Sequence, residues 1–186
     1  MACTDELMNQ ALGLAAQALF LSNPNPRVGC VLVAPDGRVI GQGSTQQAGG
    51  PHAEIMALRD AAAAGQDVRG ATAYVTLEPC AHQGRTGPCC DALAAAGIAK
   101  VVASLEDPNP LVAGQGFARL RAAGVAVEVG PGAAASRELN IGFFSRMVRG
   151  TLWVRLKVAA SLDGTTALAN GASQWITSPE ARADGH

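Results

Sequence analysis

Three soft metal-ligand side chains lie far apart in this chain, and only a folded structure can bring them to one ion. His52-Ala53-Glu54 comes first, and Pro79-Cys80 and Pro88-Cys89-Cys90 follow. Zinc prefers imidazole and thiolate ligands, and a catalytic zinc site has three protein ligands with a fourth position left for water. His52, Cys80 and Cys89 supply such a set, so we predict that the backbone converges where they lie.

A carboxylate accompanies the expected metal site. Glu54 lies two residues after His52, on the same opening turn of a predicted helix. Zinc lowers the pKa of a bound water to about 7, and a carboxylate beside it can take that proton and deliver it to a ring nitrogen or a departing amine. His-x-Glu followed by Pro-Cys is the pattern of zinc-dependent nucleobase deaminases. We therefore predict a zinc hydrolase with Glu54 as its catalytic proton shuttle.

A closed structural zinc site is the alternative. The chain has three histidines and the last is its terminal residue, so His82 or Cys90 would have to be the fourth ligand. Such a site has no need of Glu54. Adjacent Cys89 and Cys90 cannot easily aim both sulfurs at one ion where a helix starts.

The composition indicates which binding partners are disfavoured and in which cellular compartment the protein is expected. The formal net charge is −1 and aromatic residues make up 4%, which disfavours a nucleic-acid partner. An odd number of cysteines, five, favours thiol or metal chemistry in a reducing compartment. Asp5 and Glu6 lie where a signal peptide would be cationic, and the apolar stretches are interrupted. We expect a cytoplasmic protein with no membrane partner.

Apolar periodicity and turn residues predict alternating helices and strands. Helices are expected at 4–22, 52–64, 91–96, 117–123 and 136–149, and strands at 28–34, 38–43, 71–77, 100–105, 125–129 and 153–160. The first two strands form a hairpin around Pro35-Asp36-Gly37. The later alternation indicates an α/β layered sheet with some parallel pairing.

Several motifs resemble the bifunctional riboflavin-biosynthesis deaminase–reductases, the RibD family. They are Asn23–Gly29, His52–Glu54, Thr76–Leu93, Asp107–Gly116, Val158–Thr165 and Ser173–Pro179, and they span nearly the whole chain. The eight-residue separation of Cys80 from Cys89 distinguishes this family from tRNA-adenosine and cytidine deaminases, which close with Cys-x-x-Cys. The resemblance implies a cytidine-deaminase-like three-layer sandwich with a mixed central sheet at 1–147. Residues 148–186 would be the N-terminal part of a second α/β domain, the reductase, incomplete in this chain.

The resemblance also implies a reaction and its site residues. The substrate would be the small phosphoribosyl pyrimidine 2,5-diamino-6-ribosylamino-4(3H)-pyrimidinone 5′-phosphate, whose 2-amino group leaves as ammonia. The residues expected to bind it in the deaminase are Asn23 and His82 at the ring and Arg85 and Asn109 towards the sugar phosphate. In the reductase half, family members bind NADPH. The matching positions are Lys157, Ala159 and Trp175 towards the nucleotide and Ser173 towards the substrate.

Two departures from the family pattern qualify these expectations. The family usually has a histidine seven residues before the zinc histidine, where this chain has Thr45, so the substrate contacts there differ. The reductase core does not follow residue 186, so we expect no reduction by this chain alone. A deaminase of another nucleobase or nucleotide and a non-catalytic zinc module remain open, as does association into a homo-oligomer.

Overall fold

The computed structural model describes residues 3–82, 87–110, 112–173 and 175–185. The chain divides into two units, residues 1–152 and residues 153–186, and each is described by itself. Among the described residues, no helix is both long enough and apolar enough to cross a membrane.

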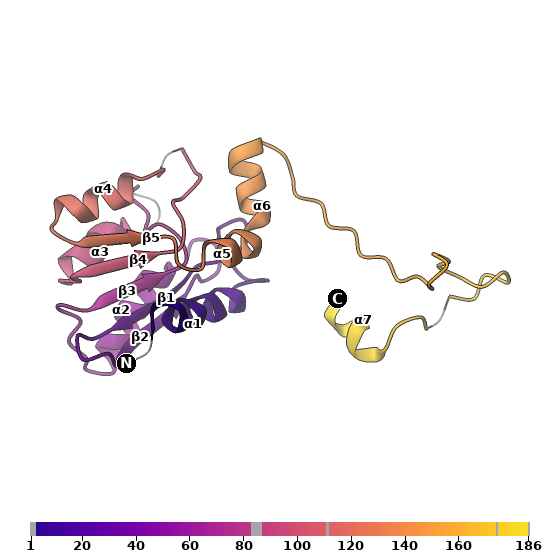
Figure 1. Ribbon diagram of the computed structural model, residues 1–186, viewed down its shortest axis with the longest axis horizontal. Helices are drawn as coiled ribbons and strands as arrows, with labels where there is room; N and C mark the ends of the chain where they lie inside the picture. Colours follow the sequence, from indigo (N-terminus) through magenta and orange to yellow (C-terminus); the bar gives the residue numbers. More distant parts are fainter. Residues whose placement is uncertain (1–2, 83–86, 111, 174, 186) are drawn as a thin grey trace. The chain divides into compact units, whose positions relative to one another are not determined.

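A five-stranded mixed sheet runs through the first unit in the order β2-β1-β3-β4-β5 (Figure 1). Its strands are β1 (Gly29–Val33), β2 (Val39–Ser44), β3 (Thr72–Val75), β4 (Lys100–Ala103) and β5 (Ala126–Val129). β1 pairs antiparallel with β2 and with β3, whereas β3, β4 and β5 are parallel. The tight turn between β1 and β2 produces the hairpin, and parallel pairs need crossover helices. The predicted hairpin and mixed sheet are confirmed.

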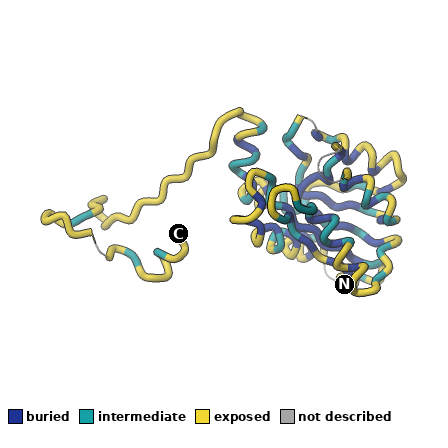
Figure 2. The backbone as a smooth tube through the Cα atoms, turned by 180° about the vertical axis from the view of Figure 1, so that it is seen from behind, coloured by how far each residue is buried: buried dark blue, intermediate teal, exposed yellow. Residues whose placement is uncertain are grey.

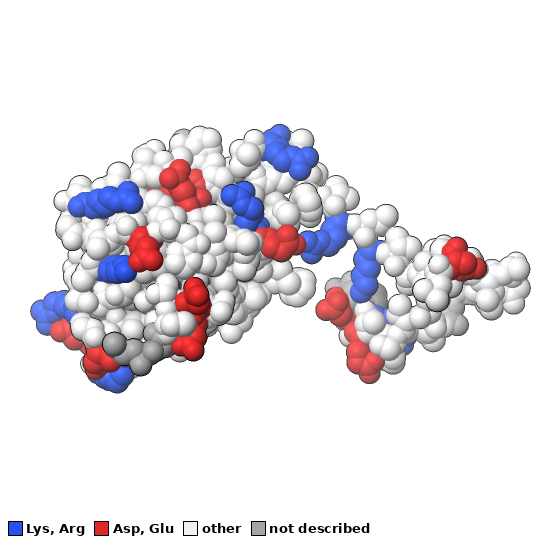
Figure 3. Space-filling view, in the orientation of Figure 1, with Lys and Arg blue, Asp and Glu red and all other residues white. Residues whose placement is uncertain are grey.

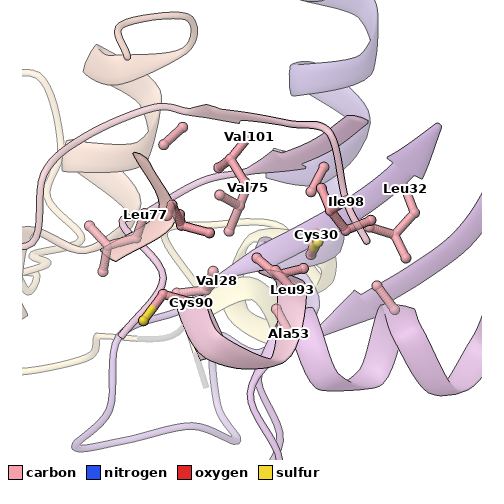
Figure 4. Packing of buried hydrophobic residues seen from close by; sticks show 14 of the residues in the cluster. Val28, Cys30, Leu32, Ala53, Val75, Leu77, Cys90, Leu93, Ile98 and Val101 are labelled. Carbon is pink, nitrogen blue, oxygen red and sulfur yellow. The ribbon is translucent and has the colours of Figure 1, made fainter. Parts of the chain in front are cut away.

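Helices cover both faces of this sheet. They are α1 (Thr4–Gln17), α2 (Ala53–Ala63), α3 (Cys89–Ala95), α4 (Gln115–Ala122), α5 (Ala133–Leu139), α6 (Ile141–Phe144) and a π-helix, η1 (Ser145–Arg149). Successive strand residues point to opposite faces of a sheet. Accordingly Val31 and Val33 of β1 pack with α1, while Cys30 and Leu32 belong to the larger core that includes α2 and α3 (Figure 4). The predicted three-layer arrangement is confirmed.

Two glycines of β2 let α2 lie directly on the sheet. A Cβ atom added to Gly43 would lie 2.4 Å from the carbonyl oxygen of Ala53, and one added to Gly41 would lie 2.4 Å from that of Ala57. Any side chain at these positions would push the helix away. The start of α2, where His52 and Glu54 lie, is therefore placed by backbone contact.

Two predicted helices differ from those observed. The first helix ends at Gln17 instead of residue 22. The side chain of Arg27 donates two hydrogen bonds to the carbonyl of Leu19, from Nε at 3.2 Å and from Nη2 at 3.1 Å, so this carbonyl is bonded outside the helix. The last helix is divided into α5, α6 and η1 around Asn140. The Asn140 side chain accepts from the backbone N–H of Arg27 at 2.7 Å and donates to its carbonyl at 2.9 Å, which attaches this bend to the loop before β1.

The second unit contains one helix among its described residues, α7 (Pro179–Gly185). The strand predicted at 153–160 was wrong, since the structure has no strand there. Val154 and Leu156 are 82% and 83% exposed, and this stretch is exposed along its length (Figure 2). A strand needs a neighbour to receive its backbone hydrogen bonds, and none of the described residues supplies one here.

Candidate active site

The three predicted metal ligands converge from three separate elements. His52 immediately precedes α2, Cys89 is the first residue of α3, and Cys80 lies beyond the end of β3. The His52 Nδ1 atom lies 3.5 Å from the Cys80 sulfur and 3.4 Å from the Cys89 sulfur. All three ligand atoms lie within 4.8 Å of one another, and no other such group of His, Cys and carboxylate side chains occurs among the described residues.

The electrostatics of the two thiols favour a cation between them. A hydrogen bond from Cys89 lowers the pKa of Cys80 to about 4, and bonds from His52 and from the backbone N–H of Cys89 at 3.3 Å contribute. The hydrogen bond with Cys80 and burial hold the pKa of Cys89 far above its usual range. One thiolate therefore forms readily and a second does not, unless a cation lies beside both sulfurs. Two thiolates and one imidazole are the ligands that zinc selects.

Glu54 lies in the first turn of α2 and is 3% exposed. Burial raises the pKa of its carboxyl group to about 7, and the negative charge of Cys80 contributes, while His52 opposes the shift. A group that titrates near neutral pH can both accept and release a proton under working conditions. Its position beside the ligand cluster fits the predicted proton shuttle.

The two alternative fourth ligands lie elsewhere. Cys90 is 1% exposed and packs in the large core (Figure 4), with its thiol 3.4 Å from a carboxylate oxygen of Asp91. His82 is exposed and does not belong to the ligand group found among the described residues. The residues that the structure describes therefore supply three ligands and leave room for water or substrate.

A cavity of about 190 Å³ opens onto the ligand cluster. It is lined by residues of the ligand cluster, the loop before β1, the loops after β3 and β4, and the segment α6–η1. The lining residues are Asn25, Pro26, Val28, Thr45, His52, Glu54, Leu77, Glu78, Cys80, His82, Asp107, Asn109, Phe143, Arg146 and Met147. A pyrimidine ring in this cavity would lie beside both the metal ligands and Glu54.

Glu78 organises one side of the cavity. Its carboxylate is buried and accepts four backbone hydrogen bonds: Oε2 from Asp107 and Gly114 at 3.1 and 2.9 Å, and Oε1 from Gly116 and Phe117 at 2.8 and 3.2 Å. The last two donors belong to the first turn of α4, which has no side-chain cap of its own. Glu78 thus attaches both α4 and the loop that carries Asn109 to the strand end that carries Cys80.

The structure brings some of the predicted substrate residues to the cavity. His82 and Asn109 line it, and the backbone N–H of Asn109 donates to the Asp107 carboxylate at 2.8 Å. Asn23 does not line it and is exposed, whereas Asn25 does line it. The physical reason is a tight turn, in which the N–H of Asn25 donates to the carbonyl of Ser22 at 2.8 Å. Arg85 lies outside the described residues.

The four residues expected to act in the reductase lie in the second unit. Lys157 donates to the carbonyl of Ala181 at 3.0 Å, and Ala159 is exposed. Ser173 and Trp175 line a shallow hollow within this unit, and the Arg182 guanidinium lies 4.0 Å from the Trp175 ring centre. The roles of these four residues in a reductase stay predictions.

Sequence reasoning missed the wall of the cavity formed by the last helical segment. Phe143, Arg146 and Met147 have the three- and four-residue spacing of one helix face, and this spacing was the available signal. Thr45 is 3% exposed, and its Oγ1 accepts from the N–H of Val28 at 3.1 Å. Thr45 therefore holds the backbone of Val28 at the cavity wall, at the position where the family that this chain resembles usually has a histidine.

Comparison with known protein families supports this assignment of the site. Residues 1–105 match the family described as the cytidine and deoxycytidylate deaminase zinc-binding region, and residues 152–186 match the RibD C-terminal domain. The riboflavin biosynthesis protein RibD of Escherichia coli K12 is 57% identical over 95% of this chain and 47% of its own length. RibD of Haemophilus influenzae is 51% identical over 95% of this chain and 46% of its own length. The chain thus spans about half the length of the curated relatives it matches.

Solved structures give the same result. Acinetobacter baumannii RibD aligns with a TM-score of 0.87 at 52% identity, covering 98% of this chain and 50% of that one. A Thermotoga maritima diaminohydroxyphosphoribosylaminopyrimidine deaminase/5-amino-6-(5-phosphoribosylamino)uracil reductase aligns with a TM-score of 0.92 at 42% identity, covering 98% and 52%. A more distant neighbour, from work on tRNA:A34 deaminases, has a TM-score of 0.55 at 30% identity and covers 72% of this chain and 98% of its own.

Proposed function

The chain belongs to the cytidine and deoxycytidylate deaminase zinc-binding family and matches its RibD members, and from this premise we propose that it deaminates a phosphoribosyl pyrimidine. The proposed substrate is 2,5-diamino-6-ribosylamino-4(3H)-pyrimidinone 5′-phosphate. This choice is supported by the relatives, two of which are riboflavin biosynthesis proteins and one a diaminohydroxyphosphoribosylaminopyrimidine deaminase/reductase. A water oxygen is added at C2, the C2–N bond breaks, and the amino group leaves as ammonia.

One geometric observation carries the proposal: the buried carboxylate of Glu54 lies beside three zinc-type ligands at a cavity. His52, Cys80 and Cys89 would hold the zinc ion, which supplies a water acidified to a pKa of about 7. Glu54 takes one proton from the attacking water and gives it to the ring nitrogen; it then takes the second proton, from the hydroxyl group now bonded to C2, and gives it to the departing amine. Because Glu54 is buried, this proton is kept from bulk solvent during the reaction.

The cavity residues support a small-molecule substrate. His82 and Asn109 offer hydrogen-bond groups to the ring and sugar, and Asn25 adds a third at the loop before β1. Figure 3 shows Lys and Arg side chains interspersed with Asp and Glu on the visible face of the first unit. A nucleic-acid-binding surface usually has clustered basic residues, so this face favours a small ligand. We place the reaction in the cytoplasm, where free thiols remain reduced.

Ammonia release combined with zinc stoichiometry tests the proposal. One zinc per chain and ammonia release from the phosphoribosyl pyrimidine, with none from cytidine or guanine, is the expected result. Release from cytidine or guanine alone would instead identify a deaminase of another base. A folded, zinc-loaded protein that releases ammonia from none of them would indicate a non-catalytic zinc module.

We propose that residues 153–186 act in NADPH-dependent reduction only within a complete reductase domain. Their described part has a single helix and no strand, and a nucleotide cleft in an α/β domain is built at the ends of several strands. We therefore expect no NADPH oxidation by this chain, measured as absorbance at 340 nm with the deaminated product present. Measurable turnover would overturn this expectation.

A further inference from the structure

Two segments that are far apart in the chain form one wall of the cavity, which we call the joined wall. The loop before β1 and the segment α6–η1 contribute its lining residues, which are Asn25, Pro26, Val28, Phe143, Arg146 and Met147. The expected metal ligands and the proposed proton shuttle belong to other elements: the start of α2, the start of α3 and the chain beyond β3. A contact that joins the two segments can therefore act on substrate binding while the reacting groups stay in place.

Asn140 makes such a contact and does not itself line the cavity. It is fully buried, and its Oδ1 atom accepts from the N–H of Arg27 at 2.7 Å. Its Nδ2 atom donates to the carbonyls of Arg27 and Ser136, at 2.9 and 3.1 Å. The oxygen and both N–H donors of the amide are thus paired. Since Arg27 lies between Pro26 and Val28, the amide binds the loop at the centre of its lining part.

Two further hydrogen bonds cross the same joint. Arg27 Nη1 donates to the carbonyl of Leu139 at 2.9 Å, and Arg146 Nη2 donates to the carbonyl of Pro24 at 3.1 Å. The side chains of Arg27 and Arg146 are both more exposed than that of Asn140. Because a hydrogen bond is stronger in the interior than in water, the Asn140 amide contributes most to the joint.

α5 is attached to the sheet independently of this joint. The Ser136 hydroxyl donates to the carbonyl of Thr76, which directly follows β3. The Thr76 hydroxyl in turn accepts from the N–H of Gly29, the first residue of β1, at 3.1 Å. Loss of the Asn140 amide would therefore free the loop before β1 from α6–η1 without detaching α5.

We propose that Asn140 is a positioning residue of the deaminase site, which fixes the joined wall in its binding arrangement before the substrate arrives. The inference rests on the proposed function, in which the phosphoribosyl pyrimidine occupies this cavity. A wall that is already fixed loses little conformational entropy on binding, so the affinity for substrate is higher. Asn140 does not touch the reacting atoms, so the chemical step does not depend on it.

The steady-state constants of zinc-loaded Asn140→Leu test this role. Leucine keeps the branched shape of the side chain and makes no hydrogen bond. The KM for the phosphoribosyl pyrimidine is expected to rise roughly 10- to 100-fold, while kcat changes by less than about twofold. One zinc per chain should be retained. A fall in kcat without a rise in KM, or a loss of zinc, would overturn the role.

Leu7→Ala is the control for a loss of stability alone. Leu7 of α1 is 4% exposed, packs in the smaller core with Val31 and Val33, and does not line the cavity. Its substitution should lower the free energy of unfolding and leave KM within about twofold of the wild type. An equal rise of KM in both variants would show that lost stability, and not the lost hydrogen bonds, weakens binding.

Hydrogen exchange decides the question if Asn140→Leu does not fold. The backbone amide of Arg27 is followed by NMR in zinc-loaded Glu54→Gln, with and without the phosphoribosyl pyrimidine. It should exchange slowly in the free protein, and saturation with the ligand should slow it by less than about threefold, because the wall is fixed beforehand. Rapid exchange that becomes slow only with ligand would overturn the proposal.

The proposed function is judged separately by ammonia release from the wild type. If no ammonia is released, and calorimetry still shows weaker binding of the phosphoribosyl pyrimidine to Asn140→Leu, the proposed function fails and the positioning role of Asn140 stands. If this ligand binds to neither the wild type nor Glu54→Gln, both proposals fail.

Discussion

The two units of this chain treat their apolar residues differently. Leu93 of α3 is fully buried in the large core of the first unit, whereas Leu156 of the second unit is 83% exposed. From the sequence, the apolar segments around Leu93 and Leu156 were both predicted to form regular structure, a helix at 91–96 and a strand at 153–160. The difference shows that an apolar pattern becomes a strand or a packed helix only where neighbours cover it. It also shows why the chemistry of the chain gathers in the first unit, where buried polar groups can be fixed.

The largest expected difference between the two units is in turnover, and it is measured by comparing a single substitution in the first unit with deletion of the second. Glu54→Gln is expected to lower turnover by about 10²- to 10⁴-fold, because it removes the proton shuttle and keeps the size of the side chain. Zinc content, measured by atomic emission, should be unchanged. Deleting residues 153–186 should leave ammonia release nearly as it was. A deletion that abolishes turnover would mean that the second unit supports the site.

Matched leucine substitutions measure the difference in packing directly. Leu93→Ala is expected to lower the free energy of unfolding by about 2–5 kcal/mol, because it leaves a cavity in a closed core. Leu156→Ala is expected to change it by less than about 0.5 kcal/mol. Urea unfolding followed by circular dichroism supplies both values. Similar losses in the two variants would show that Leu156 is covered in solution.

A buried carboxylate of the first unit, Glu78, and an exposed one of the second, Glu180, can be compared in the same way by the effect of their substitution on the free energy of unfolding. In Glu78→Gln, one oxygen becomes an NH₂ group that faces two backbone N–H donors in either orientation of the amide. We expect a loss of about 2–4 kcal/mol in unfolding free energy. Glu180→Gln, in the exposed second unit, should have almost no effect. A stable Glu78→Gln protein with normal turnover would contradict the organising role of Glu78.

The smallest expected effect concerns pH. Burial raises the pKa of Asp107 to about 6, above the 3.8 of an exposed carboxyl group. The folded state thus favours the protonated form, and this contribution to stability is complete below about pH 4 and is lost as pH rises through about 6. Asp107→Asn stays neutral, so its advantage in unfolding free energy over the wild type should grow by about 1–3 kcal/mol between pH 4 and pH 7.5.

The exposed Asp163 of the second unit is the control for that measurement. Asp163→Asn should leave the pH dependence of unfolding of the first unit as it is. Comparing each variant with the wild type at the same zinc concentration removes the effect of acid on the metal ligands. A constant difference between Asp107→Asn and the wild type over this range would show that Asp107 titrates normally.

The metal ligands and the order of strands were predictable because they depend on residue type and on alternation. His52, Cys80 and Cys89 converge as expected, and the hairpin followed from the Pro-Asp-Gly turn. Sequence analysis predicted Asn23 at the ring and did not consider Asn25, which lines the cavity within a turn whose hydrogen bond joins Asn25 to Ser22. Arg146 was missed for a related reason. The helical segment that carries it is attached to the loop before β1 by hydrogen bonds between Asn140 and the backbone of Arg27, residues that are 113 positions apart in the chain.

The direct contact between α2 and β2 has a consequence for engineering this enzyme. Gly41 and Gly43 carry no functional group, but they set how closely α2 lies on β2. The position of α2 in turn sets where Glu54 lies relative to Cys80 and Cys89. A methyl group added to either would tilt the helix that carries both a ligand and the proton shuttle. Mutational screens that vary only polar cavity residues would overlook these two positions. Substitutions at Gly41 or Gly43 would lower activity by displacing α2, without changing any group that takes part in the reaction.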